Sequence, residues 1–394
     1  MDTIEELLTR GVANIISNKE ELKKQLTSEK KLNVYFGIDP TSTKIHLGHA
    51  VALRKLQNFV ELGHNVTFLI GDFTALIGDT SDKDTERPVL TSEEIEKNFE
   101  TYKKQAEKLV NFSKVKVVHN SEWLKKLSFE DIVKLCQHFS VGDFVGRELI
   151  KKRLSENKRV GLHELLYPVM QGYDSYHLDT DIQIGGTDQT FNMQAGRTLI
   201  KDIRHKDSFV MTNVILEGTD GRKMSKSWGN AIWLDDEPND MYAKVMAIND
   251  DLIIPYFELG TNLPLDAVDK LKQDLQDGQH PMVIKHLLAN QIVVELHNQD
   301  AADKAGENFK SRVQNKEMPQ EINLHTFENT SLHLVDILIQ THLATSNSEA
   351  KRLIAQGGVS INDEVITDPN KTIDVTEEKL LKVGKKTFLK IVSK

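Results

Sequence analysis

The stretch "KIHLGHAVALRKL", residues 44–56, places two histidines three residues apart at the start of an amphipathic run. The β-rich segment "LNVYFGI" (32–38) and a turn at Asp39-Pro40 come before it, so the pattern predicts a strand, a turn and a helix. In α/β proteins, ligands bind in the crevice at this kind of connection. The first turn of a helix also carries free N–H groups and a partial positive charge, which favours anions.

His46 and His49 are expected on the same face of this helix. Both imidazoles could donate hydrogen bonds to phosphate oxygens, and Gly48 leaves room for a flat base or a sugar beside the backbone. Two other interpretations remain open here, a pair of surface histidines and part of a zinc site. Zinc needs about four ligands, and no Cys or His with suitable spacing lies nearby.

The segments that follow alternate between strand and helix patterns. Further strands are predicted at 66–72, 114–120, 181–186 and 208–216, and helices at 91–110, 129–139 and from residue 189. Such alternation is typical of a parallel sheet with helices on both faces. We therefore predict an α/β fold with a Rossmann-like, parallel-sheet domain that holds the site.

Changes in pattern divide the chain into parts. We expect the Rossmann-like domain at 1–220, a loop and linker at 221–247, an all-α domain at 248–325 and a small α+β domain at 331–394. The polar, helix-favouring segment 140–165 interrupts the first domain as an insertion, which could be a subunit contact. Residues 315–327 are expected to be a linker.

The composition excludes several classes of protein. The 394 residues carry a net charge of −9, which argues against gross nonspecific binding of nucleic acid. Residues 331–394 hold nine Lys and Arg against eight Asp and Glu, whereas the rest holds 41 against 51. A single cysteine, Cys136, favours a reducing, cytoplasmic location. The start "MDTIEELLTRGVA" is predicted to be an amphipathic helix and not a signal peptide, and no apolar run is long enough to span a membrane.

A second motif, "GTDGRKMSKSWGN" (218–230), follows the last predicted strand. Its glycines allow movement, and Lys223 and Lys226 are three apart, so that a loop could fold both over one polyphosphate. A solvated basic loop is the plainer alternative. The two motifs together resemble the signature motifs of class I aminoacyl-tRNA synthetases.

The resemblance is closer still to the tyrosyl-tRNA synthetase family and covers nearly the whole chain. It rests on five ordered segments, "YFGIDPTSTKIHLGH", "GDFTALIGDTSDKDTERP", "YPVMQGYD", "IGGTDQTFN" and "KMSKS". The resemblance implies a homodimeric ligase of protein biosynthesis that binds L-tyrosine, ATP and the tRNA for tyrosine. It also implies that the all-α domain binds the anticodon.

The resemblance assigns the amino-acid site residue by residue. Tyr35 and Asp174 match the residues that bind the substrate phenol; a buried carboxylate rejects a ligand that lacks the hydroxyl. The ammonium would be held by Asp79, Tyr167 and Gln171. Gln189 matches the contact to the substrate carboxylate.

The resemblance likewise assigns the nucleotide site. ATP would be bound by Asp39, Thr41, Gly48, Gly185, Gly186, Asp188 and Ser227. The catalytic charge would come from His46, His49, Lys223 and Lys226, with Lys83 and Arg87 in a loop that closes on the pyrophosphate. For these last two, a charged surface turn is the alternative. Mg²⁺ would arrive with ATP, and no protein-bound metal is expected.

The segment 331–368 resembles a small RNA-binding module first named for a ribosomal protein. Its second helix carries Lys351 and Arg352, which would face RNA phosphates; a stabilising appendage is the alternative. Two other functions compete with the ligase: a small-molecule adenylyltransferase and an RNA-binding protein without catalysis. Within the family, tryptophan is the nearest rival substrate, but its indole offers only a hydrogen-bond donor.

Overall fold

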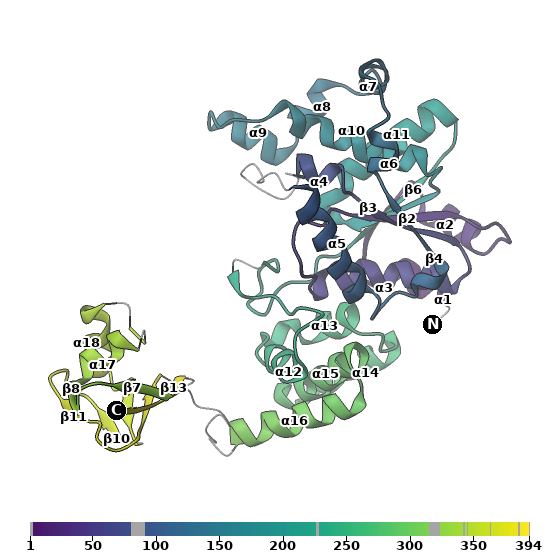
Figure 1. Ribbon diagram of the computed structural model, residues 1–394. Coiled ribbons are helices and arrows are strands. Elements are labelled where there is room, and N and C mark those ends of the chain that lie inside the picture. The colour runs from purple at the N-terminus through teal and green to yellow at the C-terminus, as the bar shows by residue number, and fades with distance from the viewer. Residues whose placement is uncertain are drawn as a thin grey trace. The chain divides into compact units, whose positions relative to one another are not determined.

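The structure is a computed structural model that describes residues 3–79, 91–225, 228–314, 324–341, 343–344, 346–362, 364–384 and 387–393. The chain forms two compact units, residues 1–306 and 307–394. Figure 1 shows the elements of both units, and each unit is described by itself.

A six-stranded sheet forms the centre of the first unit. Its strands, in spatial order, are β1 (Val12–Ile16), β6 (Phe209–Asn213), β5 (Ile182–Gly186), β2 (Asn33–Ile38), β3 (Asn65–Ile70) and β4 (Val115–His119). Every neighbouring pair is parallel except β1 with β6. The chain runs outward from β2 through β3 to β4, and then returns to β5 and β6 on the other side of β2. The predicted parallel-sheet α/β core is confirmed, and the order reverses between β2 and β5, where such sheets bind ligands.

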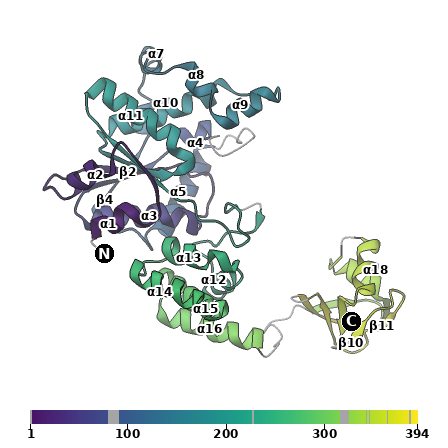
Figure 2. The ribbon, with the colours of Figure 1, turned by 180° about the vertical axis from the view of Figure 1, so that it is seen from behind.

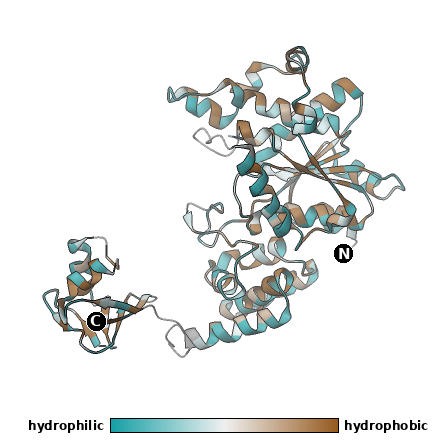
Figure 3. Cartoon of the chain, viewed as in Figure 1, coloured by the Kyte–Doolittle hydropathy of each residue, from teal (hydrophilic) through white to brown (hydrophobic). Residues whose placement is uncertain are grey.

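Helices cover both faces of this sheet. They are α1 (Thr3–Thr9), α2 (Lys19–Leu26), α3 (Leu47–Glu61), α4 (Thr74–Ile77), α5 (Ser92–Ala106), α6 (Ser121–Leu124), α7 (Phe129–Cys136), α8 (Val141–Val145), α9 (Glu148–Ser155), α10 (Leu162–His177) and α11 (Thr190–Arg204). Helix α3 lies on one face, and α10 with α11 lies on the other (Figures 1 and 2). Hydrophobic residues follow the strands and the inner sides of the helices (Figure 3).

Helices α10 and α11 pack closely because small residues meet at their contact. A Cβ on Gly172 would lie 3.1 Å from the backbone carbon of Ala195, so a larger residue at 172 would push the helices apart. This contact fixes α10, which carries three of the predicted tyrosine-binding residues.

The start of the chain differs from its prediction. We expected a helix over residues 1–13, but α1 ends at Thr9 and an antiparallel edge strand, β1, begins at Val12. Gly11 has φ +62°, a left-handed conformation that ends the helix. The following "VANII" then pairs with β6, because β-branched residues favour a strand.

The segment 140–165 contains α8, α9 and the start of α10. Arg153 of α9 forms a fully buried ion pair with Glu164, with its Nη1 2.6 Å from Oε2. Val141 and Leu162 are 73% and 74% exposed, which is unusual for large apolar side chains.

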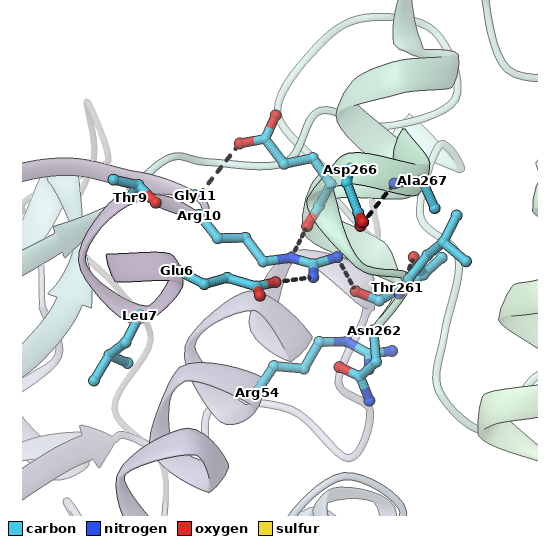
Figure 4. A network of polar contacts seen from close by, with 12 residues as sticks. Glu6, Leu7, Thr9, Arg10, Gly11, Arg54, Thr261, Asn262, Asp266 and Ala267 are labelled. Atoms are coloured by element: carbon cyan, nitrogen blue, oxygen red, sulfur yellow. Dashed lines mark hydrogen bonds and ion pairs between the residues drawn. The ribbon is translucent and has the colours of Figure 1, made fainter. Parts of the chain in front are cut away.

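The remaining helices of this unit form a separate layer. They are α12 (Pro238–Met246), α13 (Ile253–Gly260), α14 (Leu265–Gln276), α15 (Pro281–Leu296) and the first part of α16 (Gln299–Gln314). Arg10, just after α1, joins this layer to the sheet: it donates to the carbonyls of Glu258 and Thr261, both at 2.7 Å, and bonds Glu6 (Figure 4).

Two buried cations on α3 strengthen this junction. Arg54 lies 2.7 Å from Glu295 of α15, and Lys55 donates to the carbonyls of Leu7 and Arg10. Burial lowers the pKa of Lys55 to about 7. The helix that begins with the two histidines is therefore anchored at its middle to the helical layer.

The second unit is a small α+β fold. A five-stranded sheet has the order β10 (Glu364–Ile366), β9 (Val359–Ile361), β12 (Lys379–Val383), β13 (Thr387–Ser393) and β7 (Leu324–Phe327). Strands β8 (Ser331–His333) and β11 (Thr372–Asp374) pair separately, and helices α17 (Leu334–Gln340) and α18 (Asn347–Ala355) pack on the same core.

The prediction of a linker over residues 315–327 is wrong for residues 324–327. Residues 324–327 form β7, which pairs in parallel with β13 and buries Phe327 in the core of this unit. The partner strand lies more than 60 residues later in the sequence, so no local pattern signalled it. Residues 315–323 lie outside the described residues.

Candidate active site

A pocket of about 330 Å³ opens at the carboxyl ends of β2, β5 and β6, beside the start of α3. Fifteen residues predicted from the sequence line it: Tyr35, Asp39, Thr41, His46, Gly48, His49, Asp79, Tyr167, Gln171, Asp174, Gly185, Gly186, Asp188, Gln189 and Lys223. Four others, Lys83, Arg87, Lys226 and Ser227, lie outside the described residues. Lys351 and Arg352 are exposed on α18 of the second unit.

The two histidines lie in contact at the start of α3. The backbone N–H of His46, the N-cap residue, donates to Nδ1 of His49 at 3.2 Å, and the ring centroids are 3.9 Å apart. Because Nδ1 of His49 accepts a hydrogen bond, we assign its ring proton to Nε2. A Cβ on Gly48 would lie 2.9 Å from Nδ1 of His46, so any other residue at this position would displace the His46 ring.

Both imidazoles are neutral at physiological pH. Burial lowers the pKa of His49 to about 4 and that of His46 to about 2. The ammonium of Lys223 lowers both further, and Lys223 itself forms an ion pair of 3.1 Å with Asp188. The histidines can therefore serve a ligand as neutral N–H donors, while Lys223 supplies the charge.

Tyr35 and Asp174 form the innermost polar part of the pocket. Their side chains are 4% and 2% exposed, and the Tyr35 hydroxyl has no hydrogen-bond partner among the described residues. Burial raises the pKa of Asp174 to about 8. Burial also raises the pKa of Tyr35, and the charge of Asp174 raises it further. A buried hydroxyl without a partner is unfavourable, so this end of the pocket fits a ligand with a hydrogen-bonding group.

Two residues that the sequence reasoning missed hold the Asp174 carboxylate. Trp123 Nε1 donates to one oxygen at 2.7 Å, and Asn120 Nδ2 donates to the other at 3.1 Å. Asn120 directly follows β4, so the sequence could have predicted that it lies at the carboxyl edge of the sheet, near the site. Nothing in the sequence around Trp123 indicated its partner 51 residues away.

Two further pairs of side chains shape the middle of the pocket. The Tyr167 hydroxyl donates to Asp39 at 2.8 Å, and Thr74, which was also missed, donates to the other Asp39 oxygen. Gln189 Nε2 donates to Asp79 at 2.7 Å. The second pair places an anionic oxygen beside an amide, an arrangement that suits the neighbouring ammonium and carboxylate of an amino acid.

The described residues include no group of three or more His, Cys, Asp or Glu side chains arranged to hold a metal ion. In the same part of the chain, no helix is long and apolar enough to cross a membrane.

Comparison with known families gives two matches that together span most of the chain. Residues 27–314 match the family described as "tRNA synthetases class I (W and Y)". Residues 314–391 match the "Tyrosine--tRNA ligase SYY-like C-terminal domain".

Individual relatives agree with these matches. The chain is 42% identical over 398 residues to a tyrosine-tRNA ligase of Carboxydothermus hydrogenoformans, with 98% of this chain and 97% of that protein covered. It is 40% identical over 387 residues to the Thermotoga maritima ligase, with 98% and 96% covered.

A solved structure is also similar. The tyrosyl-tRNA synthetase of Archaeoglobus fulgidus, crystallised with L-tyrosine, is 25% identical, has a TM-score of 0.61 and covers 78% of this chain and 100% of its own. The family resemblance predicted from the five motifs is confirmed. The chain belongs to the class I tRNA synthetases of the tryptophan and tyrosine type, and within them to the tyrosine-tRNA ligases.

Proposed function

We propose that this chain uses the pocket described above to activate L-tyrosine with ATP and to transfer the tyrosyl group to its tRNA. The observation that carries the proposal is the buried Tyr35 hydroxyl, which has no hydrogen-bond partner among the described residues and lies in the same pocket as Asp174. A substrate phenol supplies a partner to both groups. An indole offers only a donor, which favours tyrosine over tryptophan.

The α-ammonium and α-carboxylate groups of tyrosine would bind at the middle of the pocket. Asp79, Tyr167 and Gln171 would hold the ammonium, and Gln189 would contact the carboxylate. The hydrogen bond of 2.7 Å between Gln189 and Asp79 supports this assignment. It holds the Gln189 amide and the Asp79 carboxylate close together, as the ammonium and the carboxylate of one amino acid are. The substrate is thereby oriented before it reacts.

The first reaction needs no protein nucleophile. The ionised tyrosine carboxylate attacks the α-phosphorus of MgATP, the bond to the bridging oxygen breaks, and pyrophosphate leaves with the negative charge. The N–H donors of His46 and His49 and the ammonium of Lys223 would stabilise charge on the phosphates in the transition state. Gly48, Gly185 and Gly186 would admit the nucleotide, with Asp188 accepting from the ribose and Asp39 and Thr41 near the phosphates.

Residues outside the described part complete the proposal. Lys226 and Ser227 would act beside Lys223, and Lys83 and Arg87 would assist on the leaving pyrophosphate. In the second step a hydroxyl of the terminal adenosine of tRNA attacks the tyrosyl carbonyl carbon, and AMP leaves.

We assign the remaining segments by the family's organisation. Residues 1–220 would form the catalytic domain and 221–237 the loop and linker. The helices from α12 to the first part of α16 would form the anticodon-binding domain, and the second unit, from β7 onward, an RNA-binding domain. The match of residues 314–391 to a ligase C-terminal domain supports the assignment of this segment to a domain of the family.

Replacing Lys351 and Arg352 by alanine together should weaken tRNA charging about fivefold in KM at low salt, because two phosphate contacts are lost. The dependence of that KM on salt should also become less steep. Lys371→Ala, at another exposed position of the same unit, is the matched control. An unchanged KM for tRNA in the double variant would contradict the assignment.

A homodimer and a cytoplasmic location also belong to the proposal. The apolar residues Phe129, Val133, Val141, Leu154 and Leu162 are between 45% and 81% exposed on the unit that holds the pocket. Exposed apolar side chains in this number favour burial against a second copy. Sedimentation of the purified chain as a monomer at micromolar concentration would exclude the dimer.

The activity is tested by exchange of labelled pyrophosphate into ATP in the presence of single amino acids. Exchange that depends on tyrosine, and not on tryptophan or phenylalanine, is the expected result. Exchange without any amino acid would indicate another adenylyltransferase, and no exchange at all would indicate an RNA-binding protein.

A further inference from the structure

The end of β6 holds a polar side chain that none of the roles above uses. Asn213, the last residue of this strand, lines the pocket and is only 2% exposed. Neither its Nδ2 nor its Oδ1 has a hydrogen-bond partner among the described residues. A buried carboxamide with no partner on either atom is unfavourable in the protein alone, and a ligand that pairs with it removes that cost.

The strand neighbours of Asn213 explain why the protein leaves it unpaired. In the sheet it lies between Gly186 of β5, which has no side chain, and Val12 of β1, whose side chain is apolar. The next residues of the chain, Val214 and Ile215, also line the pocket and offer only apolar side chains. No neighbour in register can therefore satisfy the amide.

The position of Asn213 separates it from the tyrosine end of the pocket. Tyr35 lies on β2, and Asn213 lies two strands away on β6, beyond β5. The wall that follows β6 reaches the start of α3, because the carbonyl of Leu216 is 3.6 Å from the Cβ that Gly48 would carry. This wall faces the small residues at which the nucleotide enters in the proposed mechanism.

The chemistry of the pocket at this end fits a purine base. Among the residues that line the pocket, Gly48, Gly185, Gly186, Val214, Ile215 and Leu216 are small or apolar. A flat base can lie between such surfaces. A carboxamide carries an acceptor beside a donor, and adenine carries the complementary amine donor beside a ring-nitrogen acceptor, so the two can form paired hydrogen bonds.

We infer that Asn213 recognises the adenine base of ATP, with Oδ1 accepting from the 6-amino group and Nδ2 donating to an adjacent ring nitrogen. The inference rests on the proposed function, since it names the residue that reads the base in the same pocket. It makes Asn213 a specificity-determining residue that contacts neither tyrosine nor the reacting phosphorus.

The test compares two nucleotides in the full chain. Asn213→Leu keeps the side chain's size and removes both polar atoms, so the variant should fold at least as well as the wild type. With ATP, its KM in tyrosine-dependent pyrophosphate exchange should rise about tenfold, and its KM for tyrosine should stay within about twofold. With purine riboside triphosphate, which lacks the 6-amino group, the wild type should already be weak, and Asn213→Leu should change KM by less than about threefold.

Thr212→Val is the matched control. It removes a hydroxyl from the neighbouring residue of β6, whose Oγ1 donates to the carbonyl of Asn14 outside the pocket. This variant should treat ATP and purine riboside triphosphate as the wild type does. Thermal unfolding of both variants checks that the strand remains in place.

The possible results separate failure of this inference from failure of the proposed function. Equal changes in KM for ATP and for purine riboside triphosphate would overturn the assignment to the base. A loss seen with ATP but not with 2′-deoxy-ATP would overturn it in favour of the ribose. In each case the wild type still exchanges pyrophosphate with tyrosine; only the absence of that exchange would refute the ligase.

Discussion

Asp174→Asn should raise the KM for tyrosine about 100-fold while changing the weak use of phenylalanine by less than about threefold. The reason is that the buried Asp174 carboxyl group is a hydrogen-bond partner of the substrate hydroxyl, and replacing it while the substrate keeps its hydroxyl costs about 3 kcal/mol. Phenylalanine has no hydroxyl, so it loses nothing. Steady-state pyrophosphate exchange with each amino acid gives both values.

Tyr35→Phe is the companion variant. It deletes a hydroxyl that makes no hydrogen bond to the described residues, so the free energy of unfolding should not fall. The KM for tyrosine should still rise about tenfold, since one neutral hydrogen bond to the substrate is lost. If both variants reduced kcat/KM for tyrosine and phenylalanine equally, the phenol would not be bound at this end of the pocket.

The raised pKa of Asp174 adds a pH dependence with a defined sign. Its folded-state pKa is about 8, against an ordinary value of 3.8, so between these values the folded protein holds a proton that the unfolded chain has released. Raising the pH through this window therefore lowers stability. In urea unfolding, Asp174→Asn should gain stability relative to the wild type as the pH rises from 5 to 8.

The sequence analysis brought together residues that line one pocket, but it was less successful at the edges of the fold. The strands of the parallel core are mostly apolar, and HLGH and the residues around Lys223 follow strands, so local pattern and the geometry of parallel sheets were enough. Strands β1 and β7 were missed because both are short and depend on partners distant in the sequence. An edge strand of four or five residues has little local signal of its own.

The sequence analysis missed some residues at the site for a related reason. Asn120 and Trp123 act through Asp174, and Asn213 is recognisable only because its amide has no partner among the residues that the structure describes. These properties are relations between segments, which no local motif encodes. The motifs named residues that are proposed to contact substrates, whereas the structure adds residues that hold one of them in place.

His49→Asn should slow formation of tyrosyl-adenylate about 100-fold in single-turnover measurements and change the Kd for tyrosine by less than about threefold. The loss of one preorganised donor to a developing charge has this size in enzymes of acyl transfer. Asn was chosen because its Oδ1 can still accept from the backbone N–H of His46, so the start of α3 keeps its hydrogen bond. His64→Asn, beyond the other end of α3, removes an imidazole outside the pocket and should leave both values unchanged.

The pH profile identifies the form of the imidazole that acts. Because the pKa of His49 is lowered to about 4, the ring stays neutral from pH 6 to pH 9, and its Nε2–H donor is present throughout. The rate of adenylate formation in the wild type should therefore show no histidine step near pH 6.5. A step at that pH which disappears in His49→Asn would mean that an imidazolium binds the phosphates; equal losses in tyrosine binding and in adenylate formation would mean that His49 only supports the shape of the pocket.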